Sequence, residues 1–263
     1  MRTSISILGC GWLGLPLGKV LADYAHEVKG ATTSINKLPV INSAGMEAFL
    51  LKGPGIDTDM DFFKTDVLII TLPPSIPGYL QIVDEVRERL VVSGIKKVIF
   101  ISSTSVYPNT NSIVVEKDAI NVASAHSGVA LLEVEEGFRQ SKNFDTTILR
   151  LAGLYGPGRE PGRFLAGKKG LSGADNPVNL VHQEDCIGVI KAVIEQGFWN
   201  KTFNVCAPSH PTRKQFYTLA CKKMNLEPPT FSGEKAPYKM VSAERLLRET
   251  GYKFQRPDPL QDL

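Results

Sequence analysis

Cysteine is scarce in this chain, and its placement excludes two kinds of site. The four cysteines among 263 residues are scattered and include no Cys-x-x-Cys pair; they are Cys10, Cys186, Cys206 and Cys221. Zinc sites and disulfide frameworks are usually built from closely spaced cysteines. We therefore expect no metal site, and we expect the thiols to serve as small apolar side chains in a reducing compartment, the cytoplasm.

Long apolar runs and an excess of one charge are also missing. A membrane-spanning helix needs about 20 consecutive apolar residues and a secretory signal needs a shorter apolar stretch, and neither pattern occurs. The 30 basic and 27 acidic residues are dispersed and leave a net charge of +3. We therefore expect neither a membrane nor a nucleic acid as a partner. With 43% hydrophobic residues, the chain can bury a full α/β core and a small appendage.

A glycine motif follows the first apolar run directly. The motif is Gly9-Cys10-Gly11-Trp12-Leu13-Gly14, and leucines at helical spacing come after it. The order strand, glycine turn, helix is typical of dinucleotide-binding proteins. Gly9 permits the tight turn, Gly11 lets the backbone approach a pyrophosphate, and Gly14 lets the helix pack close to the strand. The motif predicts a nucleotide cofactor site that includes Trp12 and Leu13; the alternative is a glycine-rich turn without a ligand.

The end of the second predicted strand bears on which nucleotide binds. NAD-binding proteins usually carry an acidic residue there, about 20 residues after the glycines, to bind the adenosine ribose. This chain has Thr33 and Ser34 instead, followed by Lys37. Hydroxyls and a lysine can donate to the 2′-phosphate of NADP and do not repel it. The sequence favours NADP, with NAD as the alternative, although an ordinary solvated lysine would look the same.

Strand-like runs alternate with helical patterns along most of the chain. The expected strands are 4–8, 27–32, 47–51, 66–71, 97–102 and 146–151. After them we expect a Gly- and Pro-rich loop at 153–177 and a short strand at 178–181. The expected helices in the last part of the chain are 184–195, one that starts at Thr212, and 242–249. This alternation predicts an α/β fold, a doubly wound parallel (Rossmann) sheet with a small C-terminal substrate domain. We assign residues 1–152 and 178–206 to the dinucleotide-binding domain, and 153–177 and 207–263 to the substrate domain. The cofactor site also takes in Thr71, Leu72 and Pro73 after the fourth strand and Ser102 at the end of the fifth.

Three further segments carry a family resemblance: residues 101–107 (Ile-Ser-Ser-Thr-Ser-Val-Tyr), 150–158 (Arg-Leu-Ala-Gly-Leu-Tyr-Gly-Pro-Gly) and 179–185 (Asn-Leu-Val-His-Gln-Glu-Asp). Together with the glycines, they resemble the extended short-chain dehydrogenase/reductase family, the NAD(P)-dependent epimerase/dehydratase group, over nearly the whole chain. The resemblance implies an oxidoreductase or epimerase with a nicotinamide cofactor. It implies that Ser103, four residues before Tyr107, hydrogen-bonds the substrate. It also implies a homodimer as an option, because many members dimerise through two helices on one sheet face.

One part of the family pattern is missing. The family's general acid is the tyrosine of a Tyr-x-x-x-Lys motif, which this sequence does not contain. Alignment by the acidic pair Glu135-Glu136 puts Ser127 and Leu131 at the two positions, and neither side chain ionises usefully near neutral pH. Three interpretations remain open: an active enzyme whose acid has moved, with His126 as the candidate; a non-catalytic NADP-binding sensor or scaffold; or a catalyst that needs only Ser103 and a positioned cofactor, with water as the proton source.

The Gly- and Pro-rich loop is the expected substrate side. It carries Arg159, Arg163, Lys168 and Lys169 within a short span. Arginine suits phosphate and carboxylate groups, so the loop predicts a small anionic substrate, such as a nucleotide sugar. We place His182 at the edge of the substrate cleft and read Asp185 as structural. Solvated loop cations without a ligand are the alternative.

Overall fold

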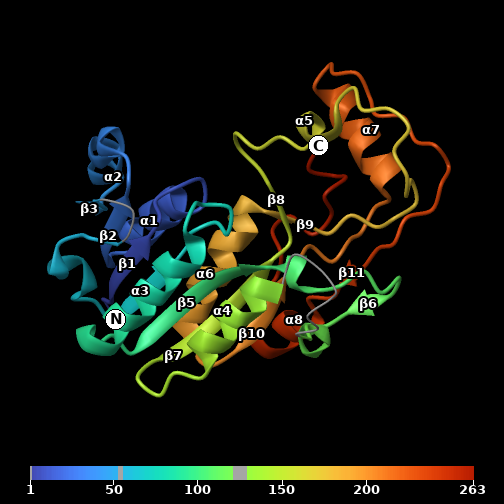
Figure 1. Ribbon diagram of the computed structural model, residues 1–263. Helices are drawn as coiled ribbons and strands as arrows, with labels where there is room; N and C mark the ends of the chain where they lie inside the picture. Colours follow the sequence, from blue (N-terminus) through green and yellow to red (C-terminus); the bar gives the residue numbers. More distant parts are fainter. Residues whose placement is uncertain (1, 53–55, 121–128) are drawn as a thin grey trace. The chain divides into compact units, whose positions relative to one another are not determined.

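The computed structural model describes residues 2–52, 56–120 and 129–263 (Figure 1). The chain forms two compact units, which are described separately. Unit 1 comprises Met1–Ser102, Ala130–Leu149 and Ile190–Thr202, and unit 2 comprises Ser103–Val129, Arg150–Val189 and Phe203–Leu263. Among the described residues, no helix combines the length and the apolar character that crossing a membrane requires.

A seven-stranded sheet has the strand order β10-β7-β5-β4-β1-β2-β3. Its strands are β1 (Ser4–Leu8), β2 (Glu27–Thr32), β3 (Glu47–Leu50), β4 (Val67–Ile70), β5 (Lys97–Ser103), β7 (Asp145–Leu151) and β10 (Thr202–Val205). The β1 strand pairs in parallel with β2 and with β4, and the pairs β2–β3 and β4–β5 are parallel too. The strand order reverses between β1 and β4, which is where ligands bind in sheets of this kind. The predicted doubly wound α/β fold is confirmed.

The central strands of unit 1 are rich in buried apolar residues. All four residues of β4 are buried, and Ile5, Ile7 and Leu8 of β1 are fully buried, as expected of strands covered on both faces. The covering helices in unit 1 include α1 (Gly14–Asp23), α2 (Leu38–Ser43), α3 (Tyr79–Ser93) and α4 (Val129–Arg139). Phe100 of β5 stacks on Phe138 of α4, with ring centroids 4.9 Å apart. Short 3-10 helices are η1 (Ile35–Lys37), η2 (Met60–Phe63), η3 (Thr104–Val106) and η4 (Glu116–Asp118).

Unit 2 carries two small parallel ribbons and a helical layer. Strands β8 (Gly153–Tyr155) and β9 (Leu180–His182) form one ribbon, and β6 (Ile113–Val114) and β11 (Met240–Val241) form the other. The helices are α5 (Gly162–Leu165), α7 (Arg213–Lys223) and α8 (Glu244–Thr250), and α6 (Gln183–Gln196) begins here. In Figure 1, α5 and α7 lie side by side. The core beneath them consists of Tyr155, Val178, Leu180 and Phe216.

Most predicted elements agree with the structure within one or two residues, and the exceptions have physical causes. The predicted helix from Thr212 starts there because Thr212 and Gln215 cap each other: Thr212 Oγ1 accepts the Gln215 N–H at 3.2 Å, and Gln215 Oε1 accepts the Thr212 N–H at 3.1 Å. The interpretation of 153–177 as continuous loop was wrong, because β8 and α5 lie within it. The β10 strand was not predicted. Its buried Asn204 interrupts the apolar pattern, and that side chain accepts a hydrogen bond from Tyr107 at 2.6 Å.

Candidate functional site

The glycine turn after β1 has the geometry that a dinucleotide needs. Gly9 adopts φ +111°, which side chains rarely tolerate. A Cβ at position 14 would lie 2.3 Å from the Gly9 carbonyl oxygen, so only glycine lets α1 begin this close to β1. A Cβ at position 11 would meet no atom within 4 Å. The backbone at Gly11 is therefore open on the side from which a ligand would approach.

The start of α1 leaves polar groups for an anion. The residue before the helix is Leu13, which is buried and offers no side-chain cap to the first N–H groups. In the described part of the chain, the Leu13 N–H itself has no backbone partner. Uncapped N–H groups and the positive end of the helix dipole together favour a phosphate. The residues at Gly9–Gly14, Trp12 included, thus fit the pyrophosphate of NAD or NADP.

Two hydroxyl residues and a lysine follow the end of β2. Thr33 and Lys37 are exposed and Ser34 is half-buried, and Lys37 ends η1. Burial raises the pKa of the Cys10 thiol to about 12, and the positive charge of Lys37 opposes that shift. Lys37 is therefore near enough to act electrostatically on a residue of the glycine turn. Two hydroxyls and an ammonium can donate hydrogen bonds to an anionic group of a cofactor.

The residues after β4 brace the turn. Thr71 Oγ1 donates a hydrogen bond to the Gly9 carbonyl at 2.6 Å and also lies 3.2 Å from the Leu8 carbonyl. Leu72 is half-buried and its side chain lies against Gly9, while Pro73 is exposed. Thr71 thus holds the turn in shape, and the segment beyond it borders the predicted cofactor site.

Ser102 is engaged with a buried carboxylate that the sequence interpretation did not assign to any site. Its Oγ donates to Glu135 Oε1 of α4 at 2.5 Å, and both residues are buried. Glu135 Oε2 lies 3.7 Å from the Arg139 guanidinium. Burial, with the Glu135 charge as a smaller cause, raises the pKa of Tyr79 at the start of α3. The Ser102 hydroxyl therefore contacts protein, and its expected contact with a cofactor stays a prediction.

The serine predicted to hold the substrate lies just after Ser102, in unit 2. Ser103 Oγ accepts the Ser105 N–H at 3.1 Å and caps η3. Accepting through a lone pair leaves the hydroxyl proton available for a second partner. Tyr107 anchors the same segment, because its hydroxyl donates to Asn204 and accepts from Arg150 at 2.8 Å. Burial raises the Tyr107 pKa to about 12, which agrees with a packing role for this side chain.

The position of the missing lysine is part of the core. Leu131, which the family resemblance aligns with the lysine of Tyr-x-x-x-Lys, is 5% exposed in the first turns of α4. The proposed replacement acid His126 and the aligned Ser127 lie outside the described residues. A buried leucine therefore stands where the family pattern has its lysine.

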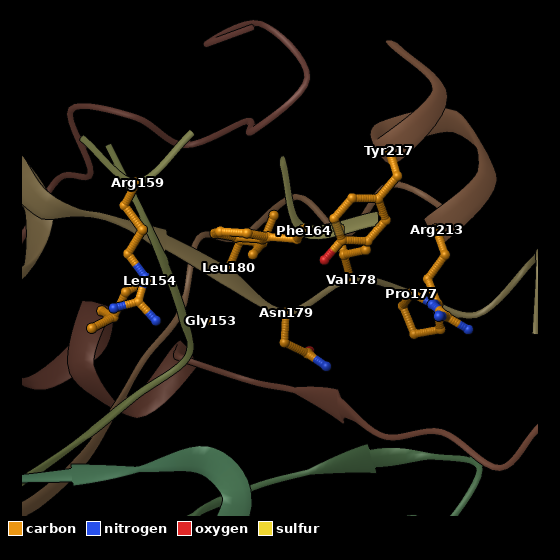
Figure 2. Close-up of a pocket in the computed structure, with 10 residues that line it drawn as sticks. All are labelled: Gly153, Leu154, Arg159, Phe164, Pro177, Val178, Asn179, Leu180, Arg213 and Tyr217. Carbon is orange, nitrogen blue, oxygen red and sulfur yellow. The ribbon is translucent and has the colours of Figure 1, made fainter. Parts of the chain in front are cut away.

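A cationic pocket in unit 2 gathers side chains from distant segments. It encloses about 290 Å³ and is lined by Arg159 and Arg213, by the rings of Phe164 and Tyr217, and by residues 177–180 of the β9 approach. Figure 2 shows the two arginines on either side of the two rings. Arg213 also donates to the Ser172 carbonyl at 2.6 Å, which fixes its guanidinium at the pocket wall. We refer to this cavity as the arginine pocket.

Only one of the three predicted substrate residues lines the arginine pocket. Arg159 does; Arg163 is largely exposed and pairs with Glu160, with 3.5 Å between Nε and Oε2. His182 lines a different cavity, where its ring meets Tyr155 edge-on at 5.1 Å. Sequence reasoning missed Arg213, Phe164 and Tyr217, although Arg213 directly follows the predicted helix start at Thr212.

The residue read as structural, Asp185, anchors the C-terminal segment. It accepts hydrogen bonds from the Tyr252 hydroxyl at 2.9 Å and from the backbone N–H groups of Gln255 and Arg256 at 2.7 and 3.0 Å. Asp185 is fully buried. The Asp185 carboxylate therefore fixes the C-terminal segment beside α6.

Comparison with known proteins gives a consistent result. Residues 76–206 match the model of the NAD dependent epimerase/dehydratase family. Protein YeeZ of Escherichia coli (strain K12) is 38% identical over 268 residues, covering 97% of each chain. A functionally unknown conserved protein from Silicibacter pomeroyi DSS has a similar fold, with a TM-score of 0.82 at 22% identity over 99% of this chain and 96% of that chain. The Bordetella bronchiseptica enzyme WbmG, solved with NAD and UDP, gives 0.75 at 17% identity over 97% and 91%.

The family match and the glycine turn point to the same conclusion. The matched region begins at residue 76, so the glycine turn at Gly9–Gly14 lies outside it and adds independent support. The fold, the open turn at Gly11 and the similarity along 97% of the chain agree. This chain belongs to the NAD dependent epimerase/dehydratase family.

Proposed function

We propose that the protein binds NADP at the glycine turn of unit 1 and acts as an oxidoreductase or epimerase on a small anionic substrate of the nucleotide-sugar type. The observation that carries the first part is the uncapped start of α1 beside the open backbone at Gly11. The arginine pocket carries the second part, since two guanidinium groups and two aromatic rings suit a base and its phosphates. WbmG, solved with NAD and UDP, has the same fold.

The chain's own residues would divide the work as follows. The nicotinamide of the bound cofactor supplies hydride chemistry. Ser103 keeps a free proton and would donate it as a hydrogen bond to a substrate oxygen, while Tyr107 and Arg150 keep its segment rigid. Arg159 and Arg213 would hold the anionic part of the substrate. The proton that accompanies hydride transfer would come from water or from His126, since the Tyr-x-x-x-Lys pair is missing.

A second candidate function is a non-catalytic NADP-binding sensor or scaffold. The buried Leu131 favours it, because an apolar side chain packed into the core can neither lower a neighbour's pKa nor hold the nicotinamide ribose. This candidate shares the cofactor site with the first and differs only in turnover.

The test separates these functions in two steps. Calorimetric titration of nucleotide-free protein with NADP, NADPH, NAD and NADH measures the cofactor site, and we expect tighter binding of the phosphorylated pair. Incubation with UDP-sugars and NADP, followed by NMR of the sugar protons, then measures turnover. Conversion that Ser103→Ala abolishes without changing NADP affinity supports the enzyme. Tight NADP binding without conversion supports the sensor, and binding of none of the four nucleotides contradicts both.

A further inference from the structure

Residues 252–263 form an irregular segment of unit 2 to which the proposed function gives no role. All of them are described, and none of them lies in a helix or a strand. Figure 1 shows the end of this segment beside α5 and α7, and its last residues line a cavity together with residues of both helices. The same two helices contribute side chains to the arginine pocket. We refer to residues 252–263 as the C-terminal strap.

The first part of the C-terminal strap is anchored at two places. Asp185 holds residues 252–256 through its three hydrogen bonds. Ser209 holds the next two residues: its N–H donates to the Pro257 carbonyl at 3.1 Å, and its Oγ donates to Asp258 Oδ1 at 3.0 Å. These polar contacts fix the course of the chain as far as Asp258.

The last part of the strap is held by one carboxylate and two leucines. The Tyr155 hydroxyl donates to Asp262 Oδ2, and Asp262 Oδ1 lies 3.6 Å from the Arg256 guanidinium. Burial, together with the Asp262 carboxylate, raises the pKa of Tyr155, so the hydroxyl keeps its proton for this hydrogen bond. Leu260 and Leu263 pack against the apolar core of unit 2. Asp262 therefore ties the end of the strap to the residue at the centre of that contact.

The apolar core under the strap is also a wall of the arginine pocket. Val178 and Leu180 belong to this core and line the pocket. Tyr217 packs against the core and lines the pocket as well. Because close-packed side chains transmit displacements to their neighbours, removal of the strap leucines would let these three pocket residues shift. The strap and a ligand in the pocket thus depend on the same side chains.

The contact between the strap and the core is incompletely packed. Asp262 and Leu263 line a cavity of about 360 Å³, which is separate from the arginine pocket. A side chain that borders a void makes fewer dispersion contacts and loses less when it moves away. Segments with few buried contacts open locally at a small fraction of the free energy of global unfolding. The strap beyond Asp258 can therefore leave the core while the rest of unit 2 stays folded.

We propose that the C-terminal strap is coupled to the arginine pocket: the docked strap holds the pocket in its binding shape, and a bound ligand holds the strap docked. Asp262 is the positioning residue of this device, because it ties the strap to Tyr155. The coupling is reciprocal, since a ligand that binds the docked form more tightly must favour docking to the same extent. The ligand half of the proposal rests on the proposed function, which assigns an anionic substrate to the pocket.

Two variants of the full chain release the strap in different ways. Tyr155→Phe removes the hydroxyl and keeps the ring, and Asp262→Ala removes the carboxylate. The matched control is Gln261→Ala on the same segment, because Gln261 is exposed and its side-chain amide donates within the strap, to Asp258 Oδ2 at 3.1 Å. A thermal melt of each variant checks that the fold is retained.

Amide hydrogen exchange followed by NMR, without any ligand, tests the first half of the coupling. The strap probe is the Leu260 N–H, which donates to Asp258 Oδ1 at 3.1 Å. The pocket probe is the Val178 N–H, which donates to the Pro211 carbonyl at 2.9 Å. We expect both amides to exchange about fivefold faster in the two variants, the order of one lost hydrogen bond, and at the wild-type rate in the control. Unchanged exchange at Val178 in both variants overturns the proposal.

Titration with UDP and with NADP tests the second half. We expect UDP binding to weaken about fivefold in both variants and NADP binding to stay unchanged, because the glycine turn belongs to unit 1. In wild type, saturating UDP should slow exchange of the Leu260 amide, a result that needs no variant. If UDP binds and this amide exchanges as before, the proposal is wrong. If wild type binds no UDP, the proposed function loses its substrate pocket, while the exchange rates without ligand still decide whether the strap and the pocket are coupled.

Discussion

The cofactor site and the arginine pocket differ in how the chain builds them. In unit 1, six consecutive residues at Gly9–Gly14 form the turn, and their spacing alone dictates the geometry. In unit 2, the arginine pocket draws on segments near residues 153–164, 177–180 and 213–217, which only the tertiary fold brings together. A contiguous motif can therefore be predicted from the sequence as a whole. The residues of a pocket that is assembled from distant segments can be predicted only singly.

The difference extends to what a single substitution does. In the glycine turn, backbone N–H groups form the binding site, so an added side chain can only obstruct the ligand. In the arginine pocket, the side chains make the site, and the backbone is held by other contacts such as the capping of α7 at Thr212. We therefore expect a turn variant whose new side chain clashes with the backbone to lose stability and binding together, and pocket variants to lose binding alone.

The largest expected effect tests this claim at the turn. In Gly14→Ala, the new Cβ would lie 2.3 Å from the Gly9 carbonyl oxygen, a backbone atom that cannot rotate away. We expect a loss of about 2–3 kcal/mol in the free energy of unfolding and no measurable NADP binding. Gly11→Ala is the matched control, because its Cβ meets nothing within 4 Å: stability should stay unchanged while NADP binding weakens. Denaturant unfolding and calorimetry measure both, and equal stability of the two variants would contradict the argument.

The second prediction applies to the arginine pocket. Arg159→Gln and Arg213→Gln each remove a cation from the pocket lining, and we expect each to weaken UDP binding about tenfold, the order of one charge-assisted hydrogen bond. Arg163→Gln is the control, since Arg163 is largely exposed and pairs with Glu160 outside the lining. Isothermal titration with UDP gives the three affinities. A loss as large in the Arg163 variant would mean that a diffuse loop charge, and not this pocket, attracts the ligand.

The predicted and missed features follow the same division between local and dispersed structure. The central strand β4 was predictable because it is a contiguous apolar run buried on both faces. The start of α7 was predictable from the short capping pattern at Thr212 and Gln215. Arg213 was missed because its partner in the pocket, Arg159, is more than fifty residues away in the sequence. Glu135 was missed as a partner of Ser102 because a carboxylate inside a helix normally reads as a solvated surface residue.

The third prediction concerns cofactor choice and has a smaller expected effect. Lys37 ends η1, which follows β2, and its positive charge acts on the Cys10 thiol of the glycine turn. In Lys37→Ala, we expect NADP binding to weaken roughly five- to tenfold, as for one partly exposed charge contact, with NAD binding unchanged. Calorimetry with both nucleotides measures the ratio. Lys29→Ala is the control variant, because the Lys29 ammonium donates a hydrogen bond to the Lys64 carbonyl at 2.9 Å. Equal weakening of NADP and NAD in Lys37→Ala would show that Lys37 supports the turn and does not select the phosphate.

The smallest expected effect compares one ion pair from each unit. The Lys97 ammonium hydrogen-bonded to Asp145 lowers the pKa of that carboxyl in unit 1, and Arg256 lowers the pKa of Glu184 in the same way in unit 2. A lowered folded-state pKa means that the stabilisation is present above the ordinary carboxyl pKa and is lost as the pH falls through the folded value. Both carboxylates are more than a third exposed, so we expect each to contribute only a few tenths of a kcal/mol to the free energy of unfolding.

Asp145→Asn and Glu184→Gln should each reduce, by a similar amount, the fall in the free energy of unfolding below about pH 4.5. Urea unfolding at pH 7 and pH 4 measures it, and a large effect in only one variant would show that the two units differ in electrostatics as well as in how their sites are assembled.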